Sequence, residues 1–268
     1  MINHDAYLLL QGWIAAALLM LALWLLQIRN RNAGIVDVGW AWATACLAVY
    51  FCFTSQSGVD ARHNLIALLM ALWGIRLGYY LARRVIGKAE DGRYAYMREY
   101  LGQRAEPVFF IFFQLQATWV VLFALPAWAA MQAPRPFVDW LDIIGVLIWL
   151  LALTGEAIAD QQLQNFRANR ENRGKVCNIG LWRYSRHPNY FFEWIHWFAY
   201  LCIGYGSPFW WINVLALPVI LFFLLRLTGI PYTEQQAIRT RGEAYLSYRR
   251  RTSVFLPLPP RDTGNTQK

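Results

Sequence analysis

Seven long apolar blocks constrain this chain more than any other feature. Each block comes close to the roughly 20 residues that an α-helix needs to cross a bilayer core about 30 Å thick. The blocks are continuous and lack a period of 2 or 3.6, which predicts an all-α, polytopic membrane protein. We expect transmembrane helices at residues 8–28, 35–53, 64–86, 107–131, 137–159, 189–205 and 207–229.

The composition leaves no room for a separate soluble domain. Charged residues make up 15% of the 268 residues and hydrophobic residues 57%, against about 25% charged in an average soluble domain. We therefore expect one membrane domain over residues 1–260, with cytoplasmic loops at 83–106 and 160–188, a C-terminal segment at 230–260, and a disordered tail at 261–268. The first block has no basic flank and no small-residue cleavage site, so we interpret it as a membrane helix and not as a signal peptide.

The basic residues predict the orientation of the helices. With the N-terminus outside and the C-terminus in the cytoplasm, 21 of the 25 Lys and Arg residues lie in cytoplasmic segments, and only Arg62 and Arg135 lie in external ones. Much of the net charge of +9 is thus a topology signal. The remaining excess also suits anionic lipid headgroups or a phosphate-bearing ligand. Nothing in the pattern indicates a nucleic-acid partner.

Cysteine and histidine spacing gives no metal signature. The four cysteines show no Cys-x-x-Cys spacing, so we expect neither a disulfide framework nor a zinc site. Glu193 and His196 form a single Glu-x-x-His, whereas di-iron bundles use that motif twice. We therefore expect no metal, and interpret His196 as a packed or hydrogen-bonded helix residue.

Five ionisable residues fall within the predicted membrane helices: Asp37, Arg76, Glu156, Glu193 and Arg226. Such a residue costs at least about 2.5 kcal/mol near the bilayer centre on insertion scales, so each one needs a reason. In the predicted topology all five lie in the cytoplasmic half and could line one cavity that opens to the cytosol. The alternative for any one of them is a side chain that reaches the interface or forms a structural pair.

The start of the sixth predicted helix carries the densest polar pattern. Pro188 suits a first helical turn, and Asn189, Glu193 and His196 then share one face. Basic residues beside the exposed N–H groups of that helix end favour a phosphate; they are Arg183, Arg186 and His187. Two further polar stripes at helical spacing could surround an elongated ligand together with this one. They consist of Glu156, Asp160 and Arg167, and of Arg76, Tyr80 and Arg84.

Residues 180–193, GLWRYSRHPNYFFE, together with Trp197, resemble the C-terminal signature of the membrane steroid 5-alpha-reductase family, particularly its bacterial branch. Asp160 through Arg167 is similar to the Asp-x-x-Leu-x-x-x-Arg stretch of that family. Tyr248 through Pro257 resembles its closing Tyr-(x)8-Pro segment. The three motifs occur in the family's order over roughly the second half of the chain, although the region between Arg226 and Tyr248 is longer here.

The resemblance implies seven helices and NADPH held at their cytoplasmic ends. It also implies reduction of a carbon–carbon double bond conjugated to a ketone, as in a 3-oxo-Δ4 steroid that enters from the bilayer. We therefore expect an integral, multi-pass protein of a bacterial inner membrane, with its cofactor site facing the cytoplasm and membrane lipid around it. The chemistry fits, because hydride delivery to the enone builds negative charge on the ketone oxygen, where an acid accelerates the step.

The site residues follow from the pattern and the resemblance together. Asp37 stands where the family has a substrate-facing glutamate and is the candidate acid, while Trp73 replaces the tyrosine that partners that carboxylate. The predicted substrate-binding residues are Asp37, Trp40 and Trp73. The predicted cofactor-binding residues are Arg76, Tyr80, Arg84, Asp160, Arg167, Arg183, Ser185, Arg186, His187, Asn189, Tyr190, Glu193, Arg226 and Tyr232.

Two other functions remain open at this point. Membrane methyltransferases of the isoprenylcysteine carboxyl or phospholipid type share Arg-His-Pro-x-Tyr and use S-adenosylmethionine, but usually continue with x-Gly where this chain has Phe191-Phe192-Glu193. A non-catalytic transporter or lipid-binding protein would also accommodate intramembrane charges and many aromatic residues. It would not need arginines on several cytoplasmic loops.

Overall fold

The structure is a computed structural model that describes residues 2–227 and 229–261, so the predicted tail lies outside the described residues from 262 onward. Within these ranges the regular structure is helical, apart from one isolated bridge between Ser185 and Ser253. Six helical segments are long and apolar enough to cross a membrane. The protein is thus an all-helical, multi-pass membrane protein. The chain divides into two compact units, Met1–Asp142 with Ile203–Asn213 (unit 1), and Ile143–Cys202 with Val214–Lys268 (unit 2).

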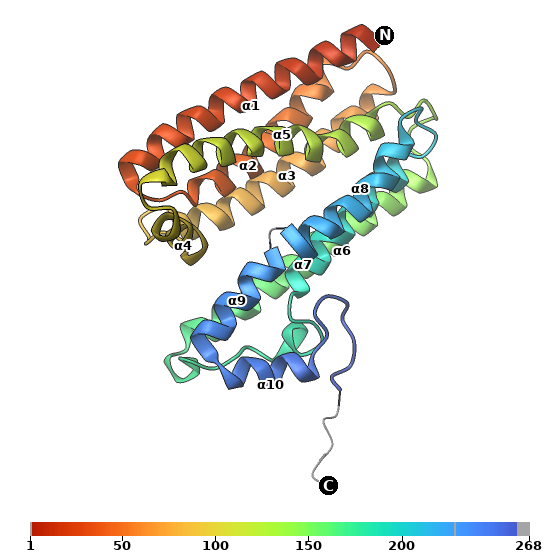
Figure 1. The fold of residues 1–268 in the computed structure, drawn as a ribbon. Coiled ribbons are helices and arrows are strands. Elements are labelled where there is room, and N and C mark those ends of the chain that lie inside the picture. The colour runs from red at the N-terminus through yellow and green to blue at the C-terminus, as the bar shows by residue number, and fades with distance from the viewer. Residues whose placement is uncertain (1, 228, 262–268) are drawn as a thin grey trace. The chain divides into compact units, whose positions relative to one another are not determined.

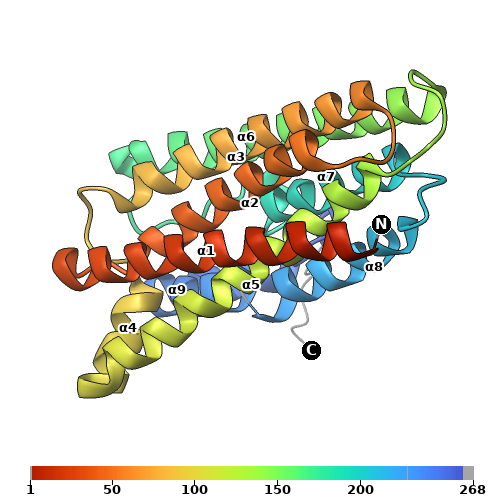
Figure 2. The same cartoon turned by 90° about the horizontal axis from the view of Figure 1, so that it is seen from above.

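Four long helices make up most of unit 1. Helix α2 contacts α1, α3 and α5, and both views show it between α1 and α3 (Figure 1, Figure 2). The bounds are α1 Ile2–Asn30, α2 Ile35–Thr54, α3 Asp60–Val85 and α5 Ala105–Met131. These helices agree with the first four predicted spans and extend them by a few residues, because polar side chains continue the helices beyond the apolar blocks.

Small residues allow α2 and α3 to approach closely. A side chain at Gly74 would place its Cβ 2.3 Å from the Cβ of Ala45, and one at Gly78 would meet the indole of Trp42. Gly74 and Gly78 form Gly-x-x-x-Gly, a spacing that lets helix backbones pack tightly in a bilayer, where van der Waals contact replaces the hydrophobic effect.

The predicted loop 83–106 contains a helix of its own. α4 (Gly92–Leu101) begins at Asp91, whose side chain accepts a hydrogen bond from the Arg93 N–H. It is followed by a single 3₁₀ turn, η1 (Gly102–Arg104), before α5 begins. Sequence reasoning did not predict this helix, and the cytoplasmic location of the segment stays a prediction. This charged segment can form a helix because Asp91 at the N-cap satisfies an N–H group that would otherwise have no partner.

Unit 2 contains most of the second half of the chain. α6 continues to Ala168, which confirms that this helix extends beyond its apolar block with a polar face. α8 leads through a π-helical segment to α9, and α9 packs against α10. The bounds are α6 Trp140–Ala168, η2 Arg170–Asn172, η3 Gly180–Arg183, α7 Pro188–Ile203, α8 Trp210–Phe222, η4 (π) Phe223–Leu227, α9 Gly229–Arg241 and α10 Glu243–Arg251.

The sixth predicted span, 189–205, corresponds to α7, which is not among the six helical segments that could cross a membrane. α7 has 16 residues, which is about 24 Å at 1.5 Å per residue and less than the bilayer core. It ends at Ile203, and Gly206 follows with a positive φ of 85°, a conformation that favours glycine. The other six predicted spans correspond to the six apolar helical segments.

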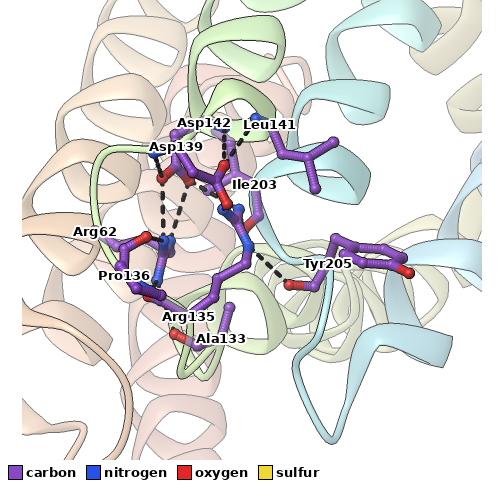
Figure 3. Close-up of polar contacts among 9 residues, drawn as sticks. All are labelled: Arg62, Ala133, Arg135, Pro136, Asp139, Leu141, Asp142, Ile203 and Tyr205. Atoms are coloured by element: carbon purple, nitrogen blue, oxygen red, sulfur yellow. Dashed lines mark hydrogen bonds and ion pairs between the residues drawn. The ribbon is translucent and has the colours of Figure 1, made fainter.

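A buried ion cluster joins α3 to the α5–α6 connection within unit 1 (Figure 3). The Arg62 side chain is 0% exposed and the Asp142 side chain 1%. Arg62 donates to both carboxylate oxygens of Asp142, at 3.2 and 3.0 Å, and to three backbone carbonyls. All five guanidinium N–H groups are thereby satisfied. The carbonyls are those of Ala133, Arg135 and Pro136.

Arg135 extends this cluster. Its guanidinium donates to Asp142 at 2.9 Å and to the carbonyls of Ile203 and Tyr205 at 2.7 and 2.9 Å. Asp139 accepts hydrogen bonds from the N–H groups of Leu141 and Asp142, and so caps the start of α6. The cluster therefore holds three chain segments and one helix end in a fixed arrangement.

We expect Arg62→Met to lower the free energy of unfolding by about 3–5 kcal/mol, because it leaves Asp142 charged and buried with fewer partners. Thermal denaturation in detergent micelles measures the effect. Adding Asp142→Asn to the Arg62→Met variant should recover part of the loss, since it removes the uncompensated charge. A melting temperature equal to that of the wild type in Arg62→Met would contradict this account of the cluster.

Candidate functional site

In unit 1, Asp37 lies in the first turn of α2 and contacts two residues of α4. The Tyr94 hydroxyl donates a hydrogen bond to Asp37 Oδ1 at 2.9 Å. Arg93 Nη2 donates to Asp37 Oδ2 at 2.6 Å and to the Tyr94 oxygen at 2.9 Å. The Arg93 guanidinium also lies over the Tyr94 ring, 4.3 Å from its centroid. The predicted acid is therefore one member of a three-residue cluster.

A second ionic network holds α4 in place. Arg98 donates to both carboxylate oxygens of Glu90, at 3.1 and 3.0 Å, and to Glu106 at 2.6 Å. It also donates to Gln27 of α1 at 2.8 Å, and Gln27 in turn donates to Glu106 at 2.6 Å. Glu90 additionally accepts a hydrogen bond from the Ala33 N–H. This network connects α4 to α1, α5 and the turn before α2, so it positions Arg93 and Tyr94 against Asp37.

Aromatic rings surround the next turn of α2. Trp40 lies three residues after Asp37, so both side chains project from the same side of the helix. Its ring is 6.1 Å from that of Trp73 and 5.1 Å from that of Phe123, both edge to face. The Trp40 Nε1 atom is buried and has no hydrogen-bond partner among the described residues. Because a buried N–H without a partner is costly, this indole is available as a donor to a ligand.

In unit 2, α6 and the start of α7 bring acidic and amide side chains together. Glu156 and Asp160 are both 5% exposed. Asn189 Nδ2 donates to Asp160 Oδ1 at 3.2 Å. The other side-chain atom of the amide, Asn189 Oδ1, is buried with no hydrogen-bond partner among the described residues. Gly155 permits this proximity, because a Cβ there would lie 2.4 Å from the Phe192 ring.

Glu193 and His196 continue the same side of α7. The Glu193 carboxylate lies 3.8 Å from His196 Nδ1, and His196 Nε2 lies 3.2 Å from the Tyr200 hydroxyl. His196 is 2% exposed, which agrees with its interpretation as a packed, hydrogen-bonded residue. Among the residues that the structure describes, no group of three or more His, Cys, Asp or Glu side chains could hold a metal ion.

Arg186 and His187 contact the C-terminal segment of unit 2. Arg186 donates to Glu234 at 2.7 Å and to the carbonyls of Arg249 and Thr252 at 3.0 and 2.8 Å. His187 Nε2 lies 3.4 Å from the same Glu234 carboxylate. Burial lowers the pKa of His187 below its ordinary value, although Glu234 acts in the opposite direction. These two residues therefore tie the start of α7 to α9 and α10, and phosphate binding by them stays a prediction.

Ser185 and Tyr190 have local structural contacts as well. The Ser185 hydroxyl donates to the Phe255 carbonyl at 2.8 Å and accepts from the His187 N–H at 3.1 Å. The Tyr190 ring stacks on His187 with centroids 5.6 Å apart and packs where Gly229 has no side chain.

The other predicted cofactor residues divide between the units. In unit 1, Arg84 pairs with Asp91 at 3.4 Å and lies over the Tyr80 ring, while Arg76 lies on the same helix. In unit 2, the exposed members are Arg167, Arg183, Arg226 and Tyr232. The prediction that five intramembrane charges line one cavity draws on both units and stays a prediction.

Sequence reasoning missed Arg93 and Tyr94. It searched for the tyrosine partner of Asp37 in α3, where Trp73 stands, and treated residues 83–106 as a loop. The available signal was Asp91, an N-cap residue type, before a run without proline in which Tyr96 and Tyr100 stand at i, i+4. That pattern indicates an N-capped helix.

Comparisons with known proteins identify a family for this chain. The model of a family described as a protein of unknown function, DUF1295, matches residues 23–252. The chain belongs to the DUF1295 family. The match includes Asp37, α4 and the start of α7. The residues around Asp37 and those around Asn189 therefore lie within the matched region.

Two relatives are uncharacterized proteins of Schizosaccharomyces pombe. One is 26% identical over 72% of this chain and 63% of its own length, and the other is 33% identical over 25% of this chain and 30% of its own length. This chain thus spans less than two thirds of the length of either relative. No solved structure matches.

We expect Arg98→Gln to loosen α4, because it leaves the carboxylates of Glu90 and Glu106 without their shared cation. Limited chymotrypsin digestion at the α4 tyrosines should accelerate about tenfold or more, equivalent to about 1.4 kcal/mol or more of local stability. Arg104→Gln, at an exposed position on the same segment, is the matched control and should digest like the wild type. Equal digestion of both variants would contradict the positioning role of Arg98.

Proposed function

We propose that this protein reduces the carbon–carbon double bond of an enone in a lipophilic substrate, with NADPH as the hydride donor. A 3-oxo-Δ4 steroid represents the substrate class. The observation that carries it is the Tyr94–Asp37 hydrogen bond, which supplies the phenolic donor that the Trp73 position lacks.

The geometry at Asp37 suits a ketone that becomes an enolate. Asp37 accepts hydrogen bonds from both Tyr94 and Arg93, so the phenol is the group that has a proton to offer. The role predicted for Asp37 alone thereby becomes a shared one, in which Asp37 orients Tyr94. A ketone oxygen that takes the place of Asp37 as acceptor would receive the Tyr94 hydrogen bond, next to the positive charge of Arg93. Preorganised donors of this kind stabilise an oxyanion without the cost of reorganising solvent.

The apolar ring cluster suits the body of the substrate. Trp40, Trp73 and Phe123 lie edge to face, and the unsatisfied Trp40 indole N–H offers a further donor one turn from Asp37. A pocket that is mostly aromatic with a few convergent polar groups is typical of sites for small lipophilic molecules.

The start of α7 suits a nucleotide cofactor. The buried Asn189 Oδ1 requires a donor, such as a ribose hydroxyl or a carboxamide N–H, and Asp160 fixes the orientation of the amide. Arg167 and Arg183 are exposed and can contact phosphates. Bound NADPH supplies the hydride that goes to the β carbon of the enone. The protein residues hold the cofactor, orient the ketone and exclude water.

The sequence resemblance supports the same assignment. The motifs shared with the steroid 5-alpha-reductase family lie on α6, on the start of α7 and on α10 with the segment that follows it. In the proposed topology the N-terminus is outside, the C-terminus is cytoplasmic, and α7 is a short seventh crossing. We further propose that the membrane is a bacterial inner membrane.

Mass spectrometry of the product formed from a 3-keto-4-ene steroid and NADPH tests this function directly. The expected product is two hydrogens heavier than the substrate and forms only when NADPH is present. Thermal shifts with each cofactor separate the alternatives, because a ligand that binds the folded state raises the melting temperature. Stabilisation by S-adenosylmethionine but not by NADPH would favour the methyltransferase instead.

We expect Glu193→Ala and Arg167→Ala each to weaken NADPH binding by about tenfold or more, which corresponds to about 1.4 kcal/mol. Both residues belong to the motifs around the start of α7, and neither change should prevent folding of the apolar helices. Binding is measured by titration of detergent-solubilised protein. Arg170→Ala, at an exposed position in η2, should bind NADPH like the wild type. Unchanged affinity in both Glu193→Ala and Arg167→Ala would remove this cofactor site.

We expect Tyr94→Phe to lower kcat by about 10²-fold, because loss of one donor to an oxyanion costs on that order. Asp37→Asn should also lower kcat, because it removes the carboxylate that orients the Tyr94 hydroxyl. NADPH affinity should stay unchanged, since these residues act on the ketone. Tyr100→Phe removes a hydroxyl from an exposed tyrosine of the same helix and should keep full activity. Normal turnover in Tyr94→Phe would show that the phenol is not the donor.

A further inference from the structure

The segment after α10 folds back on the start of α7 in a fixed conformation. The Arg186 N–H donates to the Ser253 carbonyl at 2.8 Å, and the Leu258 N–H donates to the Tyr184 carbonyl at 3.0 Å. The Phe255 side chain points inward, where it is 5% exposed and packs against Phe191. The segment is therefore an ordered part of unit 2 and lies beside the first turn of α7.

The opposite side of this segment is apolar and exposed. Val254, Leu256 and Leu258 are 37%, 50% and 50% exposed. They flank the buried Phe255, and residues 256–259 are all exposed. Single exposed apolar residues are common on proteins, whereas a contiguous apolar patch marks an interaction site.

Arginines border this apolar row. Arg249 and Arg250 are 51% and 61% exposed at the end of α10. Their carboxylate contacts, to Glu234 and Glu243, are long at 3.8 and 3.9 Å. The Arg261 N–H donates to the Arg251 carbonyl at 2.8 Å, so the far end of the segment returns to the same arginine run. Such exposed, loosely paired cations leave a net positive charge around the leucines.

We propose that the basic–apolar surface, formed by Val254, Leu256, Leu258, Arg249, Arg250 and Arg261, docks into a membrane leaflet rich in anionic phospholipid. The leucines enter the boundary between headgroups and acyl chains, and the arginines bind the lipid phosphates.

Charge and position both favour this partner. Anionic headgroups complement clustered arginines near a membrane surface, each contributing to binding. The α10 arginines follow closely after the helical segment Trp210–Arg241, which is long and apolar enough to cross a membrane. Figure 1 shows the segment next to α10 in unit 2. This inference does not depend on the proposed enzymatic activity.

Alkylation of an introduced cysteine tests the proposal on the full-length protein in nanodiscs. A membrane-impermeant maleimide reacts with Leu256→Cys or with the control Glu243→Cys, whose position on α10 is 84% exposed. Peptide mass spectrometry quantifies each site separately, so the four native cysteines do not interfere. The lipid is phosphatidylcholine with or without phosphatidylglycerol. Melting temperatures of both variants in detergent verify that they fold.

We expect phosphatidylglycerol to slow alkylation of Leu256→Cys by at least about fivefold relative to Glu243→Cys, since each arginine near an anionic surface adds to binding. Adding Arg250→Gln and Arg261→Gln should remove most of that protection. Fast alkylation at both positions in phosphatidylglycerol would overturn the proposal. Equal protection in both lipids and in detergent would also overturn it, because the leucines would then be covered by protein.

Discussion

A polar group in apolar surroundings has to be satisfied by the protein itself, and this constraint shapes both units. Arg62 uses all five of its guanidinium N–H groups on one carboxylate and three carbonyls. Arg186 in unit 2 reaches a carboxylate and two carbonyls in the same way. Backbone carbonyls that helices leave without partners at chain turns thus become ligands for arginine. The connections between helices are consequently ordered.

The same constraint explains how a carboxylate can persist at Asp37. An intramembrane acid without partners is costly, and Arg93 and Tyr94 supply both a cation and a donor. Those partners come from α4, which depends on Arg98 and its two glutamates for its position. The ion pairs of Arg98 therefore position α4 so that Arg93 and Tyr94 contact Asp37. The cluster is also what a reaction that develops charge on a ketone oxygen would need.

Sequence reasoning predicted the helical class and most helix positions because long apolar blocks are a strong and local signal. It predicted the polar extension of α6 from the spacing of Glu156, Asp160 and Arg167, since helical periodicity continues across the membrane boundary. It missed α4 because high charge in a short segment resembles a loop. It placed α7 within two residues of its bounds, because Pro188 and the Gly204–Pro208 run mark the two ends.

The sequence by itself determined that the chain is an all-helical membrane protein, because hydrophobicity is a sum over neighbouring residues. It also singled out Asp37, Asn189 and Asp160 as candidate site residues. Only the tertiary structure decided which partners they have. The contact of Tyr94 with Asp37 joins residues 57 positions apart, and the chain path between them is set by packing and ion pairs that no local pattern encodes.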